Sequence, residues 1–270
     1  MIVTDKFVMI NFPKTGSAFA RKMLQIVHHG SNYSYLDKLL FKLNIVKRPY
    51  FEIFEVPNIR DMSHRRNFMD EHGIFIQIPD EHRKKLVLSI KRNIYDRYIS
   101  IYEFEDWKRD PWLDIDVLKN KFSNYPDLSF EQFMSLILNN NPMELLPEVN
   151  RKLPVGPITS QFILFYFREP FKILNSIDEH YIASEDFKKD LADIRFIDQA
   201  NLNNELFQFL KDLGYKERRI KFILDGQPIN KSTPAGKTRD DYFTEELYKE
   251  VQSKEKLLFK ILDHLKTKDQ

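Results

Sequence analysis

The sequence contains no cysteine. This absence excludes disulfide bonds, thiolate nucleophiles and zinc sites built with cysteine. Long apolar runs are also missing: the longest, residues 162–167, is far too short to span a bilayer. Asp5 and Lys6 interrupt the N-terminal region before a long apolar segment develops. We therefore expect a soluble, cytoplasmic protein with no transmembrane segment and no secretion signal.

An excess of charge of one sign is missing as well. Lys and Arg number 42 against 40 Asp and Glu, so no overall field attracts nucleic acid or an anionic membrane. Any anion binding must therefore be local, and no nucleic-acid partner is expected. The 270 residues can bury a sizeable core, and they contain no internal repeat and no linker rich in Gly, Ser or Pro. The sequence predicts a single domain over residues 1–270.

Short apolar runs alternate with segments of helical periodicity. Strands are predicted at Phe7–Phe12, Leu86–Ile90 and Ile194–Ile197. Helices are predicted at Thr15 to about His29, from Ile94 onward behind an Asn93 cap, at Ser129–Asn139, Thr159–Phe167 and Asn203–Leu213, and as one final helix capped by Thr244. This alternation predicts an α/β fold with a central, mostly parallel sheet flanked by helices on both faces. Ligands then bind at the carboxyl ends of the strands.

The strongest local signal lies between Phe7 and Phe19. The stretch reads FVMINFPKTGSAF, in which an apolar run stops at Pro13 and a Lys-Thr-Gly-Ser turn opens an amphipathic helix. The first amides of a helix lack internal partners and carry the positive end of its dipole, so this layout favours anion binding, with Lys14 adding a mobile charge. It is not the nucleotide-triphosphate loop, where Gly directly precedes Lys. Taken alone, it is equally typical of an ordinary strand-to-helix connection.

A second segment, KRNIYDRYISIY, again takes a predicted strand into a helix. Arg92 and Ser100 lie eight residues apart across this junction, close to two helical turns, so both can reach one phosphate. Arginine offers a planar fork of donors that suits phosphate, and serine adds a hydroxyl. The plainer alternative is a surface arginine in a salt bridge and an exposed helical serine.

Together these segments resemble the sulfotransferases that use 3′-phosphoadenosine-5′-phosphosulfate (PAPS). The family's 5′-phosphosulfate loop reads approximately Pro-Lys-Thr/Ser-Gly-Ser/Thr, which residues 13–17 match. Its 3′-phosphate motif is Arg, seven residues, then Ser, which Arg92 and Ser100 match, and Asp96-Arg97 is the pair common in members acting on carbohydrates. The resemblance implies a P-loop nucleotide-hydrolase-like sulfotransferase fold.

Further likeness to this family continues along the chain. Residues 201–215 are similar to a late strand-to-helix segment ending in Leu-Gly-Tyr, and residues 230–232 and 242–247 to the terminal loop and helix. Two regions, residues 31–69 and 107–169, match nothing in the family. We expect them to be variable insertions that shape the acceptor pocket, and the first reads loosely as helix or loop.

The resemblance also implies residue roles, with PAPS as co-substrate, 3′-phosphoadenosine-5′-phosphate (PAP) as product and no metal. Lys14 would neutralise charge on the bridging oxygen as the 5′-phosphate departs, and Arg92 with Ser100 would bind the 3′-phosphate. The 5′-phosphate would be held by backbone amides and hydroxyls of Thr15, Gly16, Ser17 and Ala18. Lys237 and Arg239, with Lys231 and Ser232 on the same loop, would close over the nucleotide, unless they form only a charged surface loop.

An acceptor hydroxyl also needs a base, and imidazole suits that role at neutral pH. His72 is the best candidate, because His72-Gly73 lies 20 residues before Arg92, like the upstream His of the chondroitin and heparan 2-O enzymes. The alternative is a last-turn histidine before a glycine helix stop. His64 is the reserve candidate, and Glu52 or Glu55 would serve in a site that uses a carboxylate.

The sequence thus predicts sulfuryl transfer from PAPS to an acceptor hydroxyl of a carbohydrate or small metabolite. One alternative is a nucleotide or sugar kinase that uses the first loop for ATP, although the sequence lacks Gly-Lys-Ser/Thr and a clear acidic metal ligand at a strand end. Another is a non-catalytic nucleotide-binding or glycan-binding homologue that has lost the base. The acceptor itself and the oligomeric state are left open.

Overall fold

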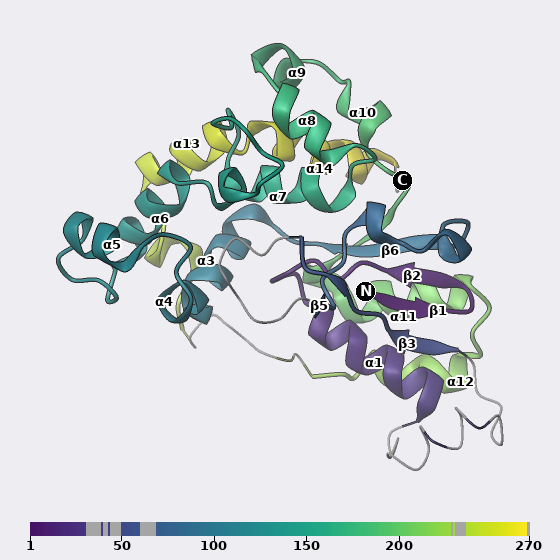
Figure 1. The fold of residues 1–270 in the computed structure, drawn as a ribbon. Coiled ribbons are helices and arrows are strands. Elements are labelled where there is room, and N and C mark those ends of the chain that lie inside the picture. The colour runs from purple at the N-terminus through teal and green to yellow at the C-terminus, as the bar shows by residue number, and fades with distance from the viewer. Residues whose placement is uncertain are drawn as a thin grey trace.

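The computed structural model describes residues 1–30, 39, 43, 50–59, 69–227, 229 and 236–268. The predicted α/β class is confirmed: a central sheet lies between layers of helices (Figure 1). Its strands are β1 (Ile2–Thr4), β2 (Phe7–Met9), β3 (Phe51–Ile53), β6 (Leu86–Lys91) and β7 (Arg195–Asp198). A separate two-stranded sheet pairs β4 (Val56–Pro57) with β5 (Met69–Asp70).

The prediction of a mostly parallel sheet is wrong in one respect, because the sheet is mixed. Its order is β3-β1-β2-β6-β7, with β2, β6 and β7 parallel and the β1 pairings to β2 and β3 antiparallel. The predicted parallel strands at β2, β6 and β7 are confirmed, although β2 stops at Met9. Their carboxyl ends therefore meet at one edge, where ligands bind in open α/β sheets.

The sequence pattern locates the helices well. The main ones are α1 (Ser17–His29), α3 (Ile94–Phe104), α6 (Phe130–Asn139), α7 (Pro157–Tyr166), α11 (Leu202–Asp212), α13 (Glu245–Lys254) and α14 (Lys256–Lys268). Shorter ones are α4 (Asp106–Arg109), α5 (Ile115–Lys121), α8 (Pro170–Ser176), α9 (Glu179–Ala183), α10 (Phe187–Asp190) and α12 (Glu217–Ile220). The 3-10 helices are η1 (Phe75–Gln77), η2 (Asp80–His82), η3 (Pro142–Leu145), η4 (Gln199–Asn201), η5 (Lys221–Ile223) and η6 (Arg239–Asp241).

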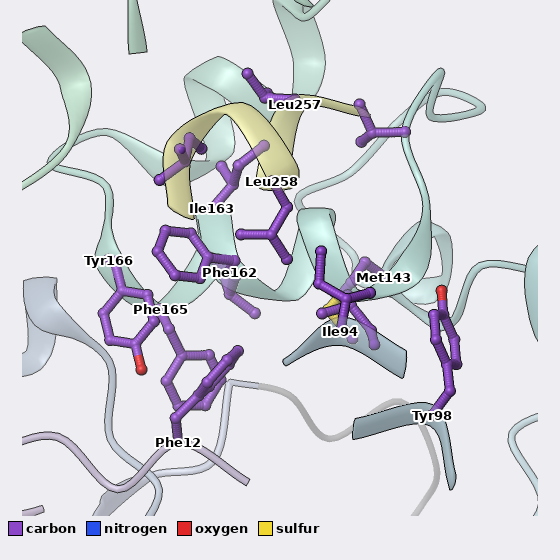
Figure 2. Packing of buried hydrophobic residues seen from close by; sticks show 14 of the residues in the cluster. Phe12, Ile94, Tyr98, Met143, Phe162, Ile163, Phe165, Tyr166, Leu257 and Leu258 are labelled. Atoms are coloured by element: carbon purple, nitrogen blue, oxygen red, sulfur yellow. The ribbon is translucent and has the colours of Figure 1, made fainter. Parts of the chain in front are cut away.

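Alternating side chains of the strands supply two hydrophobic clusters, one on each face of the sheet. Phe7 and Met9 of β2 belong to the cluster with α1 and α11, whereas Val8 belongs to the cluster with α3, α7 and α14. The close view in Figure 2 shows the second cluster, in which Phe12 packs against Phe165 and Tyr166 of α7. The residue that opens the first loop is thereby anchored in the core.

Two helix starts follow from local capping, as predicted. The Asn93 side chain accepts hydrogen bonds from the Tyr95 and Asp96 amides at the start of α3. Ser129 and Gln132 form a reciprocal capping box at the start of α6. Such caps satisfy first-turn amides that have no helical acceptor.

The single final helix predicted after Thr244 is wrong, because the structure divides it at Glu255 into α13 and α14. Thr244 does cap α13, accepting from the Leu247 amide at 3.3 Å. Glu255 is fully buried and accepts hydrogen bonds from the Ile158 and Thr159 amides at 3.1 and 2.7 Å. These amides begin α7, so the carboxylate of one helix junction caps a different helix.

The two regions without likeness to the family take different forms. In residues 31–69, the described parts include β3, β4 and the start of β5, so the expectation of helix or loop there missed three short strands. Residues 107–169 carry most of α4 and all of α5, α6 and α7. In the described part of the chain, no helix combines the length and apolarity needed to cross a membrane.

Candidate functional site

The loop after β2 has an unusual backbone. Lys14 and Gly16 both adopt positive φ angles, 66° and 96°, a region that non-glycine residues seldom occupy and that clusters at functional sites. Between them, the Thr15 hydroxyl donates to the Phe12 carbonyl at 2.8 Å and is 1% exposed. The Thr15 hydroxyl is expected to contact a phosphate, but here its proton is used in a hydrogen bond that holds the loop. The backbone amides of the loop are then the donors that remain for an anion.

Gly16 stands where the loop becomes α1. The Phe19 and Ala20 amides donate to the Gly16 carbonyl, so the Ser17 and Ala18 amides precede the first helical hydrogen bonds, and no side chain caps the helix. A Cβ on Gly16 would lie 3.0 Å from Leu202 Cδ2 of α11. Glycine therefore permits both the backbone angle and close packing against the connection after β7. The half-buried helix start presents free amide donors for an anion.

Arg92, the first residue after β6, reaches the same loop. Its Nη1 donates to the Lys14 carbonyl at 2.9 Å, and its Nε is buried without a hydrogen-bond partner among the described residues. Burial lowers the pKa of Arg92, an effect opposed by Asp96 and reinforced by Arg239. The structure thus brings together two residues that the sequence motifs select separately.

The Lys14 side chain lies against α3 and the start of α4. Its Nζ sits over the ring of Phe104, a cation–π contact. Desolvation lowers the pKa of Lys14 to about 8, a shift that Asp106 opposes and that Arg109 and Arg92 reinforce. A lysine that is partly deprotonated near neutral pH gains most from a nearby anion, which would raise its pKa again.

A second group of charges lies beside α3. Arg239 of η6 makes a two-pronged ion pair with Asp96, at 2.6 and 2.8 Å. Ser100 is one helical turn beyond Asp96 and is 4% exposed, so the exposed helical serine of the plainer alternative is excluded. Arg92, Ser100 and Arg239 therefore gather on one side of α3.

His72 follows β5 rather than ending a helix, which excludes its reading as a helix-stop residue. Its Nδ1 lies 2.7 Å from the Asn11 carbonyl, and its backbone amide donates to Asp70 at 3.0 Å. Because a carbonyl only accepts, Nδ1 carries the proton, which leaves the lone pair of the neutral ring on Nε2. The ring is half-buried, tied to the segment that leads into the Lys14 loop.

A cavity of about 240 Å³ opens beside Pro13 and Lys14. Its other walls are largely apolar and come mainly from α3 and from the region 107–169, through residues that include Ile101, Trp107, Trp112, Ile137, Met143 and Ile158. Residues of region 107–169 thus line a cavity next to the loop, and their role in shaping an acceptor pocket stays a prediction. Asp70, Asp106 and Asp110 add carboxylates to the lining.

The remaining candidate residues are either exposed at the surface or lie outside the described residues. Lys237 is exposed, with Nζ 5.0 Å from the ring centroid of Tyr242. Glu52 lies on strand β3, where it accepts the Tyr50 hydroxyl, and Glu55 is exposed. His64, Lys231 and Ser232 lie outside the described residues.

Sequence reasoning missed the roles of several residues in this region. Asn11 holds His72 through its carbonyl, and its own Oδ1 is buried without a partner among the described residues. Arg97 and Gln161 meet in the cavity wall. For Arg97 the available signals were the Asp96-Arg97 pair and the spacing of Arg97, Ser100 and Phe104 along one face of a predicted helix.

No family model, curated protein or solved structure matches this chain.

Proposed function

We propose that this chain transfers a sulfuryl group from PAPS to an acceptor hydroxyl. The observation that carries the proposal is the 2.9 Å hydrogen bond from Arg92 to the Lys14 carbonyl. It joins two sequence motifs, each weak by itself, at the carboxyl edge of the parallel strands. Two adjacent positive side chains beside uncapped helix amides suit a ligand with two separate anionic groups.

The residues present suit the donor nucleotide. The amides of Gly16, Ser17 and Ala18 would hold its 5′-phosphate, and the missing Cβ of Gly16 leaves the backbone open to it. Arg92, with a buried Nε that lacks a partner among the described residues, would bind the 3′-phosphate together with Ser100. Arg239 would join them once its two-pronged pair with the half-buried Asp96 opens, and the 3′-phosphate would then replace that carboxylate as its partner.

The chemical step needs charge stabilisation and a base more than covalent catalysis by the protein. PAPS supplies an activated sulfuryl group, and the acceptor oxygen attacks sulfur while the bond to the 5′-phosphate oxygen breaks. Lys14 would stabilise the negative charge that remains on that oxygen. His72, through Nε2, would accept the proton of the attacking hydroxyl.

Isothermal calorimetry of the full chain tests the proposal, comparing PAP with ATP in the presence and absence of magnesium. We expect tight, metal-independent binding of PAP. A preference for magnesium-ATP would overturn the proposal in favour of a kinase. Binding of PAP with no transfer to any hydroxyl acceptor would instead point to a non-catalytic nucleotide-binding protein.

A further inference from the structure

Arg97 is a buried cation that the proposed donor site does not use. It lies in the second turn of α3, is 2% exposed, and its guanidinium carbon is 3.7 Å from the ring centroid of Phe12. Its Nη2 donates to Gln161, whereas Nε and Nη1 are buried with no hydrogen-bond partner among the described residues. Unmade bonds of a buried charged group are costly, so such groups usually have a partner.

Arg97 is not held by a direct ion pair: within the part of the chain that the structure describes, its side-chain hydrogen bond goes to the neutral Gln161. The negative charge of Glu255 favours the charged form of Arg97 only through space. The buried carboxylate of Glu255 is instead engaged by Tyr98, Ile158 and Thr159. Burial lowers the pKa of Arg97 to about 10, which still leaves it positively charged at neutral pH.

Trp112 provides a second donor in the same cavity wall. Its Nε1 is buried and has no acceptor among the described residues. Indole and guanidinium N–H groups only donate, so a ligand that satisfies both must bring an oxygen acceptor. A carboxylate would supply two acceptor oxygens and one negative charge, which matches two such donors and one buried cation.

The size and lining of the cavity restrict the rest of the ligand. At about 240 Å³ it is smaller than typical sites for drug-sized ligands, which span roughly 300–1,000 Å³. Its apolar walls suit one ring rather than a chain of sugars. Asp70, Asp106 and Asp110 also line it, and their charge disfavours a dianion such as phosphate more than a monocarboxylate.

We propose that the acceptor is a small, mainly apolar hydroxy acid whose carboxylate binds Arg97 and Trp112. Resting on the proposed function, this places the acceptor ring between Arg97 and Lys14, which both line the cavity, with its hydroxyl toward the loop. Arg97 and Trp112 then determine specificity, while Lys14 and His72 act on the transferred group and the proton.

The test measures binding of acceptor probes to the full chain by calorimetry, with and without PAP. The probes are 4-hydroxybenzoate, 4-hydroxyphenylacetate and 3-(4-hydroxyphenyl)propionate, each paired with its neutral amide. We expect at least one acid to bind about tenfold or more tightly than its amide, since a charge-assisted hydrogen bond contributes about 1.5–3 kcal/mol. If no acid binds more tightly than its amide, the proposal is overturned.

Two variants assign the preference to residues. Arg97→Met keeps a long apolar side chain in the buried position, and it should abolish the preference for the acid. Trp112→Phe should reduce it several-fold, and it serves as the informative variant if Arg97→Met does not fold. Arg218→Met, at an exposed arginine on α12 that does not line the cavity, is the matched control and should change nothing. An unchanged acid preference in Arg97→Met or Trp112→Phe would contradict the assignment.

The results also separate this inference from the proposed function. If PAP binds and neutral phenols are sulfated as well as acids, the donor assignment stands and the carboxylate inference falls. If acids bind selectively without PAP, but PAP neither binds nor supports transfer, the carboxylate site stands and the sulfotransferase proposal falls.

Discussion

Arg92 and Lys14 are joined by a hydrogen bond between a side chain and a backbone carbonyl, although 78 residues separate them in sequence. The guanidinium after β6 thus fixes the loop after β2 and still has a buried Nε with no partner among the described residues. The same group therefore has a structural bond and an unfilled donor, and its replacement should affect both the loop and the nucleotide.

We expect Arg92→Ala to weaken PAP binding by about 10- to 100-fold, because charge-assisted hydrogen bonds contribute about 1.5–3 kcal/mol. Adenosine 5′-phosphosulfate lacks the 3′-phosphate, so its binding should weaken only by the smaller share that comes from the loosened Lys14 loop. Calorimetry with both nucleotides measures the difference. Equal losses for the two would contradict the role of Arg92 at the 3′-phosphate.

Lys14→Ala should lower kcat by about 100- to 1,000-fold, the usual effect of removing one group that stabilises transition-state charge. Lys22→Ala, an exposed lysine on α1, is the control. The wild-type kcat/KM for PAPS should also fall as pH rises through about 8, where Lys14 of the unliganded protein loses its proton. Lys14→Arg should move this fall to higher pH, and an unshifted profile would assign it to another group.

His72→Ala should lower kcat by about 100-fold or more, as expected for loss of a general base, while PAP still binds. Sulfate transfer assays and calorimetry on the same preparation separate the two effects. His180→Ala is an exposed control. If His72→Ala retained full turnover, the base would have to be sought elsewhere.

Gly16→Ala should destabilise the protein and abolish PAP binding. A left-handed backbone at a residue with a Cβ costs about 1–2 kcal/mol, and the new methyl group would also press on Leu202 at 3.0 Å. Gly214 also has a positive φ of 77°, and a Cβ there would make only an ordinary 3.8 Å contact with Lys6 Nζ, so Gly214→Ala is the control in which the backbone cost dominates. Thermal melts should show the larger loss for Gly16→Ala, and equal losses would exclude the packing contribution.

Glu255→Ala should lower the free energy of unfolding by about 3 kcal/mol or more, because it leaves buried donors of α7 and Tyr98 without an acceptor. Glu250→Ala, on the exposed face of α13, is the control. Chemical denaturation measures both, and a loss no larger than that of the control would refute the capping role.

The pH dependence gives a second check on Glu255. Burial raises its pKa in the folded state above the usual value of about 4.3. The native state then holds the proton more tightly, so wild type should lose stability relative to Glu255→Gln as pH rises from about 4.3, the unfolded-state pKa, to the raised folded-state pKa. A pH-independent difference would show that the carboxyl group keeps one charge state.

Local signals explain which parts of the fold were predictable. The run LVLSI followed by Asn93 marks β6 and the start of α3, since both features depend on a few neighbouring residues. The strands β1 and β3 span three residues each. A segment this short cannot show an alternating hydrophobic pattern, so the sequence did not predict these two antiparallel strands. The break at Glu255 depends on a contact with α7 that the continuous helical pattern does not reveal.

The candidate site divides in the same way. Lys14, Gly16 and Arg92 stand in compact motifs whose residue types suit anions, and the structure brings them together. Arg97 and Trp112 both line a cavity made by α3, α7 and the region between them, and only the tertiary fold places them in one cavity wall. The positive φ angle of Lys14 could not be predicted from the sequence either, because no turn rule requires it at a lysine.

The long sequence separation between Arg92 and Lys14 has a kinetic consequence. Parallel pairing of β2 with β6 must close a loop of more than seventy residues before their hydrogen bond can form, and contacts of this kind slow folding. The edge that carries Lys14 and Arg92 is therefore expected to complete late in folding, after the local helices and the hairpin of β1 and β2. Refolding followed by PAP binding should lag behind refolding followed by far-ultraviolet circular dichroism.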